Sequence, residues 1–157
     1  MTAGGVVPYF AALVARTSDG WEGRNLDLDG LTDMGTLAET MAAVADVDEP
    51  VLLLVEQEDE WFAVARVDGD ADLRLFVSHP TAVAAGWAGA LLVPDLAAAD
   101  PPEESSGAPG PDLDLLDDLG MPAEELLEMV DEELLPADAL GAVAERAGCA
   151  DLVDELR

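Results

Sequence analysis

Residues 51–67 read VLLLVEQEDEWFAVARV and predict a pair of buried antiparallel strands. The branched apolar run 51–55 has no polar interruption, which is typical of a strand covered on both faces. The polar run 57–60 is long enough only for a turn, so residues 61–67 re-enter as a second strand. Its faces alternate, with Trp61, Ala63, Ala65 and Val67 on one side and Phe62, Val64 and Arg66 on the other. A further strand at 73–78 completes a three-stranded antiparallel meander, which we expect at the centre of the fold.

Two more strands are predicted ahead of this meander. Residues 8–16 are largely apolar on both faces, and the dipeptide Asp19-Gly20 that follows favours a hairpin, because both turn positions prefer positive φ. Residues 21–28 then alternate in character from one position to the next, which is typical of a partly solvated strand at the edge of a sheet.

Two short helices are predicted between and after these strands. Thr36 and Glu39 have the spacing of a capping box, and the apolar stripe that follows predicts a first helix. A second helix is expected over 78–86, and a short last strand at 90–93. We therefore predict that residues 1–96 form an α+β domain, with a mostly antiparallel sheet and its two helices on one face.

The composition changes after this domain. Residues 97–111 are rich in Pro, Gly, Ser and acidic side chains, which predicts a flexible acidic linker. Residues 112–157 return to helical periodicity and predict a small bundle of short amphipathic helices. Its expected helix boundaries are the starts Pro122 and Pro136 and the C-caps Gly120 and Gly148. A bundle of this size is near the limit for independent folding, so docking on the first domain or on a partner both remain open.

The charge is strongly one-sided. The chain has 35 acidic residues and only six basic ones, all arginine, for a formal net charge of −29. Such a chain repels phosphate backbones, so direct binding to nucleic acid or to an anionic membrane is disfavoured. The charge either serves solubility alone or attracts a basic partner.

The cellular compartment follows from what the sequence lacks. Cys149 is the single cysteine, which excludes an internal disulfide and agrees with a reducing compartment. No apolar run approaches the roughly 18 residues of a membrane span, and the first residues carry no basic segment. We expect a cytoplasmic protein.

The residue types needed for familiar chemistry are scarce, and we expect no catalytic residue, cofactor or metal. His79 is the only histidine and lies far from Cys149 in the sequence, so no zinc site of familiar spacing can be built. The zinc deaminase signature, H-x-E followed by P-C-x-x-C, is absent. The acidic segment 68–72 is interpreted as a turn, because glycine and glutamate are missing where a calcium loop needs them. Phosphate loops and Gly-x-Ser-x-Gly are also missing.

One acidic turn is dense enough for acid/base or metal chemistry, although hairpin tips also collect surface charge. We therefore predict this turn as a partner-binding surface. The predicted contact residues are Glu56, Glu58, Asp59, Glu60 and Trp61. One alternative is an enzyme that uses the 56–60 turn or His79. A second alternative is an acidic inhibitor that mimics nucleic acid.

Three groups of segments carry a resemblance to a known family. They are YFAALVART at 9–17 with DGW at 19–21, then LVEQEDEWFAVARVDG at 54–69, and finally DLG at 118–120, GCAD at 148–151 and LR at 156–157. Together they resemble the tRNA adenosine deaminase-associated proteins of high-GC, actinobacterial-type bacteria. The resemblance spans nearly the whole chain and is weakest through 26–47 and the linker; its most specific piece is the turn EQEDEWF.

This resemblance implies an association with a tRNA adenosine deaminase, and it brings no established activity or catalytic residues. Combined with the charge, it predicts a non-catalytic acidic accessory protein that binds or regulates a tRNA deaminase or another basic partner.

Overall fold

The computed structural model describes most of the strands and the C-terminal helices of the 157-residue chain. The described residues are 9–17, 20–26, 28, 34–44, 50–57, 60–67, 73–79, 82–83, 92, 110–111, 114–132 and 134–156.

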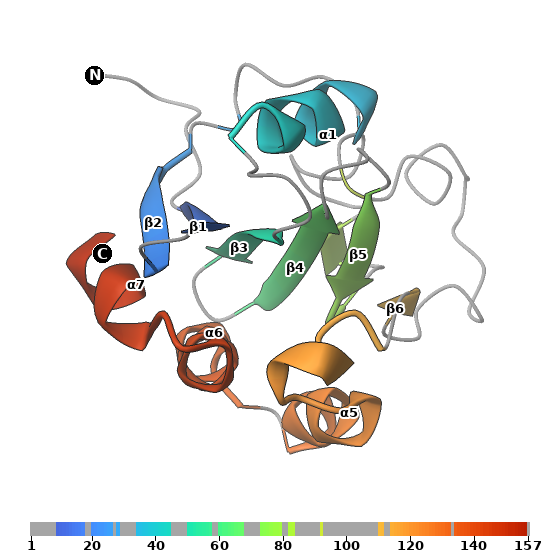
Figure 1. The fold of residues 1–157 in the computed structure, drawn as a ribbon. Helices are drawn as coiled ribbons and strands as arrows, with labels where there is room; N and C mark the ends of the chain where they lie inside the picture. The colour runs from blue at the N-terminus through green and yellow to red at the C-terminus, as the bar shows by residue number, and fades with distance from the viewer. Residues whose placement is uncertain are drawn as a thin grey trace.

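An antiparallel sheet runs through the molecule in the order β2-β1-β3-β4-β5-β6 (Figure 1). Its strands are β1 (Phe10–Thr17), β2 (Gly20–Asn25), β3 (Val51–Gln57), β4 (Trp61–Val67), β5 (Arg74–Val77) and the two-residue β6 (Gly110–Pro111). The described helices of seven or more residues are α1 (Met34–Ala42), α5 (Ala123–Asp131), α6 (Pro136–Ala147) and α7 (Ala150–Leu156), with a 3₁₀ turn η3 at Asp117–Leu119. Strands fill the N-terminal part and helices the C-terminal part, which confirms the predicted α+β class.

The meander β3-β4-β5 has the pairing that the sequence predicts. Gln57 pairs with Trp61 and Val51 with Val67, so β3 and β4 match along their full length. β1 lies on the other side of β3, and β2 is an edge strand, as its alternation predicted. Because β2 and β3 both pair with β1, the chain crosses from one side of β1 to the other, and α1 lies in this crossover.

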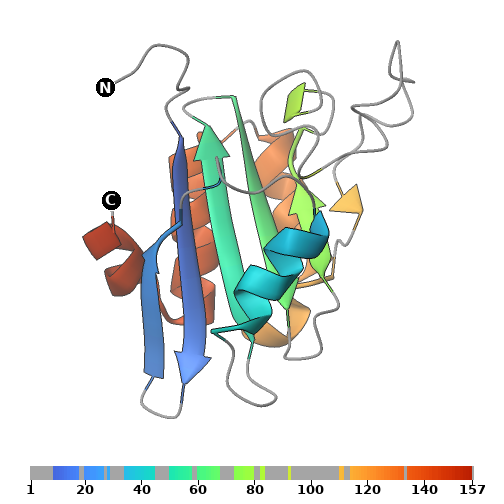
Figure 2. The same cartoon turned by 90° about the horizontal axis from the view of Figure 1, so that it is seen from above.

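Helices cover both faces of the sheet (Figures 1 and 2). On one face Leu37 and Met41 of α1 pack against the Trp61 side of β4. On the other face α5, α6 and α7 pack against the Phe62 side, with Leu140 completely buried. Every residue of β4 is therefore buried, which explains its nearly unbroken apolar composition.

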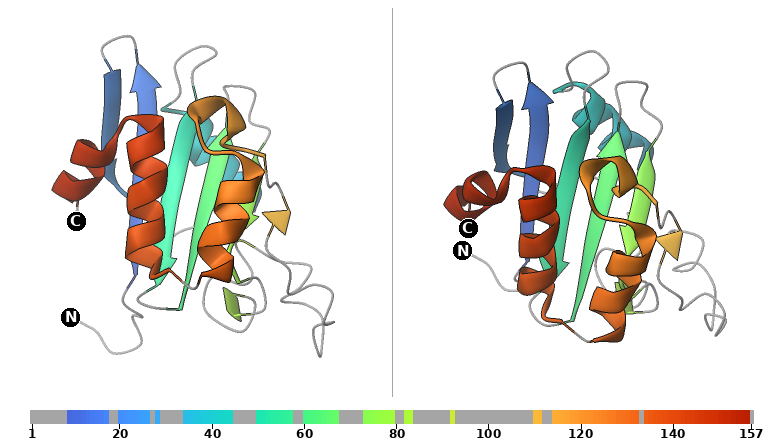
Figure 3. Two further views of the ribbon diagram at one scale, coloured as in Figure 1. Left: turned by 90° about the horizontal axis from the view of Figure 1, so that it is seen from below. Right: turned by 60° about the horizontal axis from the view of Figure 1, so that its bottom comes forward.

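This arrangement settles where the C-terminal helices dock. Their apolar residues and those of the sheet form one continuous core cluster, with strand residues Val14, Leu52, Leu54, Phe62, Val64 and Phe76 facing helix residues Leu126, Met129, Leu140, Val143 and Val153. Figure 3 shows α5 and α6 lying side by side across this face. The sequence left open whether these helices dock on the first domain or on a partner. The structure shows that they dock on the sheet of the first domain.

The boundaries of the C-terminal helices agree closely with the sequence. Gly120 and Gly148 have left-handed φ values of 100° and 94° and end η3 and α6, as predicted for C-caps. Pro136 occupies the first turn of α6, where a missing backbone N–H costs nothing. The amides of Gly148 and Cys149 both donate to the carbonyl of Ala144, at 2.9 and 2.8 Å, and so turn the chain from α6 into α7.

Two predicted boundaries are wrong. α1 begins at Met34, so Thr36 is inside the helix and does not cap it. The Thr36 carbonyl accepts a 2.9 Å hydrogen bond from the hydroxyl of Thr40, which is the contact that a threonine makes within a helix. The predicted linker is also too long at its end, because Gly110–Pro111 pairs with β5 as strand β6.

Other predicted segments are described only in part. Within 78–86, Ala82 and Val83 are helical, and the Val83 amide donates to the His79 carbonyl at 3.1 Å. Of the strand expected at 90–93, only Leu92 is described, and it is buried and helical rather than extended. The turns at 18–19 and 68–72 and the linker residues 97–109 lie outside the described residues.

We expect Leu140→Ala to lower the free energy of unfolding by about 2–5 kcal/mol, because it leaves a cavity between α6 and the sheet. Leu127→Ala removes the same atoms from an exposed site on α5 and should cost about 0.5 kcal/mol or less. Urea unfolding followed by circular dichroism measures both values. Equal, small effects of the two substitutions would contradict the docking of α6 on the sheet.

Candidate functional site

The predicted acidic turn is only partly a surface. Glu60 is exposed, and its carboxylate accepts a 3.0 Å hydrogen bond from the side-chain amide of Gln57. Glu56 is buried near the end of β3, and Trp61 is only 2% exposed within the core on the α1 side. Glu58 and Asp59 lie outside the described residues. The alternation of β4 already grouped Trp61 with Ala63 and Val67, and this was the signal for its burial.

The Ser78–His79 pair is the nearest approach to a nucleophile and base. The His79 Nδ1 atom lies 2.8 Å from the Ser78 hydroxyl oxygen. That oxygen also accepts a 2.9 Å hydrogen bond from the Phe62 amide, and Ser78 is only 1% exposed. Within the described part of the chain, no carboxylate hydrogen-bonds to the imidazole. Ser78 thus extends the pairing of β5 with β4 from a buried position.

Cys149 is a second group with reactive potential that the fold encloses. The side chain is buried against α6, and burial raises the pKa of its thiol to about 11. The thiol is therefore protonated at neutral pH and a poor nucleophile. No group of three or more His, Cys, Asp or Glu side chains among the described residues could hold a metal ion.

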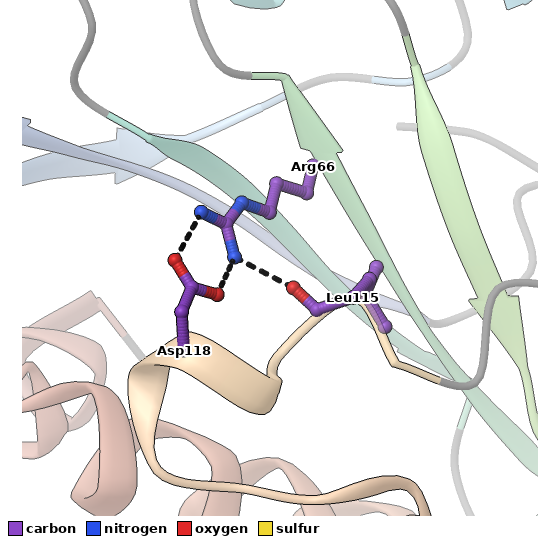
Figure 4. Close-up of polar contacts among 3 residues, drawn as sticks. All are labelled: Arg66, Leu115 and Asp118. Carbon is purple, nitrogen blue, oxygen red and sulfur yellow. Dashed lines mark hydrogen bonds and ion pairs between the residues drawn. The ribbon is translucent and has the colours of Figure 1, made fainter.

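Among the described residues, a cluster of three polar contacts joins β4 to the C-terminal segment (Figure 4). The guanidinium of Arg66 donates from Nη1 to the Leu115 carbonyl and to Asp118 Oδ1, both at 2.6 Å, and from Nη2 to Asp118 Oδ2 at 2.8 Å. The side chain of Arg66 is 5% exposed, whereas that of Asp118 is 65% exposed. The hydrogen bond from Arg66 is the main reason that the pKa of Asp118 lies below its ordinary value, and Arg74 adds to this effect.

Arg66 is a residue whose role the sequence interpretation missed. It occupies an inward-facing position on an otherwise apolar strand, and an arginine there requires a hydrogen-bonded counter-ion. That requirement was a signal that an acidic residue elsewhere must approach the sheet. Asp118 supplies it from 52 positions along the chain.

Further polar contacts hold the helices on β2 and against each other. The indole nitrogen of Trp21 donates to the Ala147 carbonyl at 3.1 Å, and the side-chain amide of Asn25 donates to the Leu156 carbonyl at 2.9 Å. Arg146 of α6 contacts Glu125 of α5 at 2.8 Å. These contacts position the helices, and none of them leaves a group free for catalysis.

One open cleft of about 220 Å³ lies on the α1 side of the sheet, beside β1 and β2. Its lining residues are Leu13, Ala15, Thr17, Glu22, Gly23, Arg24 and Val44. Its volume is below the roughly 300–1,000 Å³ of typical small-molecule sites. The cleft alone does not support a cofactor or substrate site.

An apolar surface does stand out at the junction of α5 and α6. Leu127, Leu134 and Leu135 are 37%, 39% and 51% exposed, and they are the large exposed hydrophobic residues of the described chain. Exposed acidic residues flank them, namely Glu124, Glu128, Asp131, Glu132 and Asp138. We call these eight residues the α5–α6 surface. Exposed apolar and acidic side chains thus alternate along this stretch of sequence, and protein interfaces likewise combine apolar and polar residues.

Comparison with known families adds the decisive observation. The profile of a family described as Rv3753c-like tRNA adenosine deaminase-associated protein matches residues 9–150. The chain belongs to this family. The resemblance inferred from the sequence is therefore confirmed, whereas the high-GC bacterial origin stays a prediction. Searches of curated proteins and of solved structures gave no match.

Membership in the deaminase-associated family supports the general part of the predicted function, which is association with a deaminase. It supports an accessory role beside a tRNA adenosine deaminase, and its description names an associated protein rather than a deaminase. None of the described helices has the length and apolar character that a membrane crossing requires.

We expect Asp118→Asn to lower the free energy of unfolding at pH 7 by about 1–3 kcal/mol, because buried Arg66 loses its counter-ion and charge-assisted hydrogen bonding. The folded-state pKa of Asp118 lies below 3.8, so its contribution is present above that pH and disappears as pH falls through the folded-state value. The difference between wild type and variant should therefore shrink from about pH 5 downward.

Urea titrations at several pH values measure this difference. Asp117→Asn is the matched control, because Asp117 is exposed and forms no ion pair within the described residues; it should change stability by about 0.5 kcal/mol or less. A pH-independent difference between wild type and Asp118→Asn would contradict the assigned role of the carboxylate.

Proposed function

We propose that this protein is a non-catalytic accessory protein that binds a tRNA adenosine deaminase directly, with the α5–α6 surface as its main contact. The family match over residues 9–150 is the observation that carries the proposal, because it links the chain to that enzyme class. The burial of Ser78 and of Cys149 supports a role without chemistry, since the fold encloses these two potential nucleophiles of the described chain.

The charge supports the choice of partner. An enzyme that handles tRNA needs basic side chains to neutralise phosphates. A chain with a net charge of −29 is attracted to such a surface over long distances, which speeds the encounter more than it strengthens the final complex. Affinity must then come from desolvated contacts, and Leu127, Leu134 and Leu135 are the large exposed apolar side chains among the described residues that can supply them.

The 56–60 turn is a second proposed contact, of which Glu60 is the exposed described residue. An acidic surface that reaches the basic groove of the enzyme would also compete with tRNA. Binding and regulation are therefore separate readouts: the first is affinity for the enzyme, and the second is deaminase turnover on tRNA with and without this protein.

The test is calorimetric titration of this protein with the purified tRNA adenosine deaminase of the same organism. We expect Leu127→Gln/Leu134→Gln/Leu135→Gln to weaken binding at least about tenfold, because it removes the apolar centre of the contact. Glu124→Gln/Glu128→Gln/Asp131→Asn should weaken binding and also reduce its salt dependence. Circular dichroism of each variant checks that the fold is intact.

A matched control removes three charges from another helix. Asp151→Asn/Asp154→Asn/Glu155→Gln changes the net charge equally, on the exposed side of α7, and should change affinity by about threefold or less. If both charge triples weaken binding equally, the contact is a diffuse effect of net charge, as expected for a nucleic-acid mimic. If the wild type does not bind at low salt, the proposal is wrong.

A further inference from the structure

The outer edge of β2 is the longer of the two sheet edges that the described chain leaves open, because the strand at the other end, β6, has only two residues. β2 pairs with β1 on one side, and no described strand pairs with it on the other. Figure 3 shows β2 at the end of the sheet, with α7 beside it on one face. An open edge presents unpaired backbone N–H and C=O groups, which is a template for pairing with another strand.

The register of β2 identifies which groups face outward. The Leu26 amide donates to the Ala11 carbonyl at 3.0 Å, so this is a hydrogen-bonded pair of the β1–β2 ladder. Hydrogen-bonded pairs recur every second residue in an antiparallel ladder, which assigns Glu22 and Arg24 to the β1 side. The backbone groups of the intervening Trp21, Gly23 and Asn25 therefore point to the open edge.

The side chains on this edge have opposite charges. Glu22 and Arg24 lie two residues apart on the same face of β2, on either side of Gly23, and both are exposed. Neither forms an ion pair or hydrogen bond within the described residues. This is unusual for a cation in so acidic a chain, because Arg66 and Arg146 both contact carboxylates.

We propose that two copies of this chain pair through their β2 edges, around a two-fold axis at Gly23, and so form one continuous antiparallel sheet. In this register Gly23 opposes Gly23 of the second copy, and Trp21 opposes Asn25 of the second copy. Both are pairs of outward-facing backbone groups, so both can form hydrogen bonds. Glu22 then faces Arg24 of the second copy, and the symmetry creates this ion pair twice.

The charges also select this register over its neighbours. Side chains in the non-hydrogen-bonded positions of an antiparallel pair approach most closely, and Glu22 and Arg24 occupy these positions. A slip of two residues in one direction would oppose Glu22 with Glu22, and a slip in the other direction would oppose Arg24 with Arg24. Like charges directly opposite each other are destabilising, so only the Gly23-centred register is favoured.

The opposite interpretation is that charged side chains protect this edge from pairing, as lysines often do. Protection works through repulsion between equal charges on two copies. Glu22 and Arg24 together carry no net charge and attract their counterparts when two copies meet antiparallel, so they favour pairing.

Sedimentation velocity of the full chain, from about 5 to 500 µM, tests this proposal. We expect a concentration-dependent dimer that is stronger at about 0.2 M salt than at 0.02 M, because salt screens the repulsion between two chains of charge −29. Glu22→Arg and Arg24→Glu should each weaken the dimer at least about tenfold, since each places like charges opposite.

Two combinations should restore the dimer. The double variant Glu22→Arg/Arg24→Glu exchanges the two charges and recovers the ion pairs within its own dimer. An equimolar mixture of the two single variants recovers them between unlike copies. Both sites are exposed, so thermal melting should stay within a few degrees of the wild type.

A wild type that remains monomeric throughout this range, or a dimer that both single variants leave unchanged, would overturn the proposal, as would failure of both combinations to restore it. The proposal is independent of deaminase binding. The variants of the α5–α6 surface should dimerise like the wild type whether or not they bind the enzyme.

Discussion

The guanidinium of Arg66, enclosed between β4 and the C-terminal segment, is the constraint on which the rest of the structure depends. A buried cation needs a counter-ion and hydrogen-bond acceptors, and Asp118 and the Leu115 carbonyl provide them. Meeting that need brings residues 115–118 to the sheet, directly ahead of α5. The helices that follow then bury the Phe62 face of β4, which would otherwise be an exposed apolar surface.

A sheet covered on both faces limits where partners can bind. Among the described residues, the accessible surfaces include the β2 end of the sheet and the outer sides of the helices. In Figures 1 and 3 β2 lies at one end of the sheet, whereas α5 lies over the half that contains β4 and β5. A β2-linked dimer would therefore leave two α5–α6 surfaces free, and such a dimer could engage a multimeric partner at two points with greater avidity than one copy has.

The sequence was informative wherever local chemistry determines structure. The uninterrupted apolar run of β3, the start of α6 at Pro136 and the end at Gly148 follow from rules about neighbouring residues. Long-range pairing was not accessible in this way: nothing near Arg66 indicates that Asp118 is its partner. Trp61 shows a different limit, because a tryptophan beside an acidic turn resembles an interface residue until its strand partners show that it belongs to the core.

The sheet and the C-terminal helices form one cooperative unit held together across the Phe62 face. Native-state hydrogen exchange in low concentrations of denaturant tests it most directly. We expect the slowest amides of α6 and of β3 to exchange with the same free energy and the same denaturant dependence, since both require global unfolding. Exchange of α6 through a lower-energy opening that leaves β3 protected would contradict it.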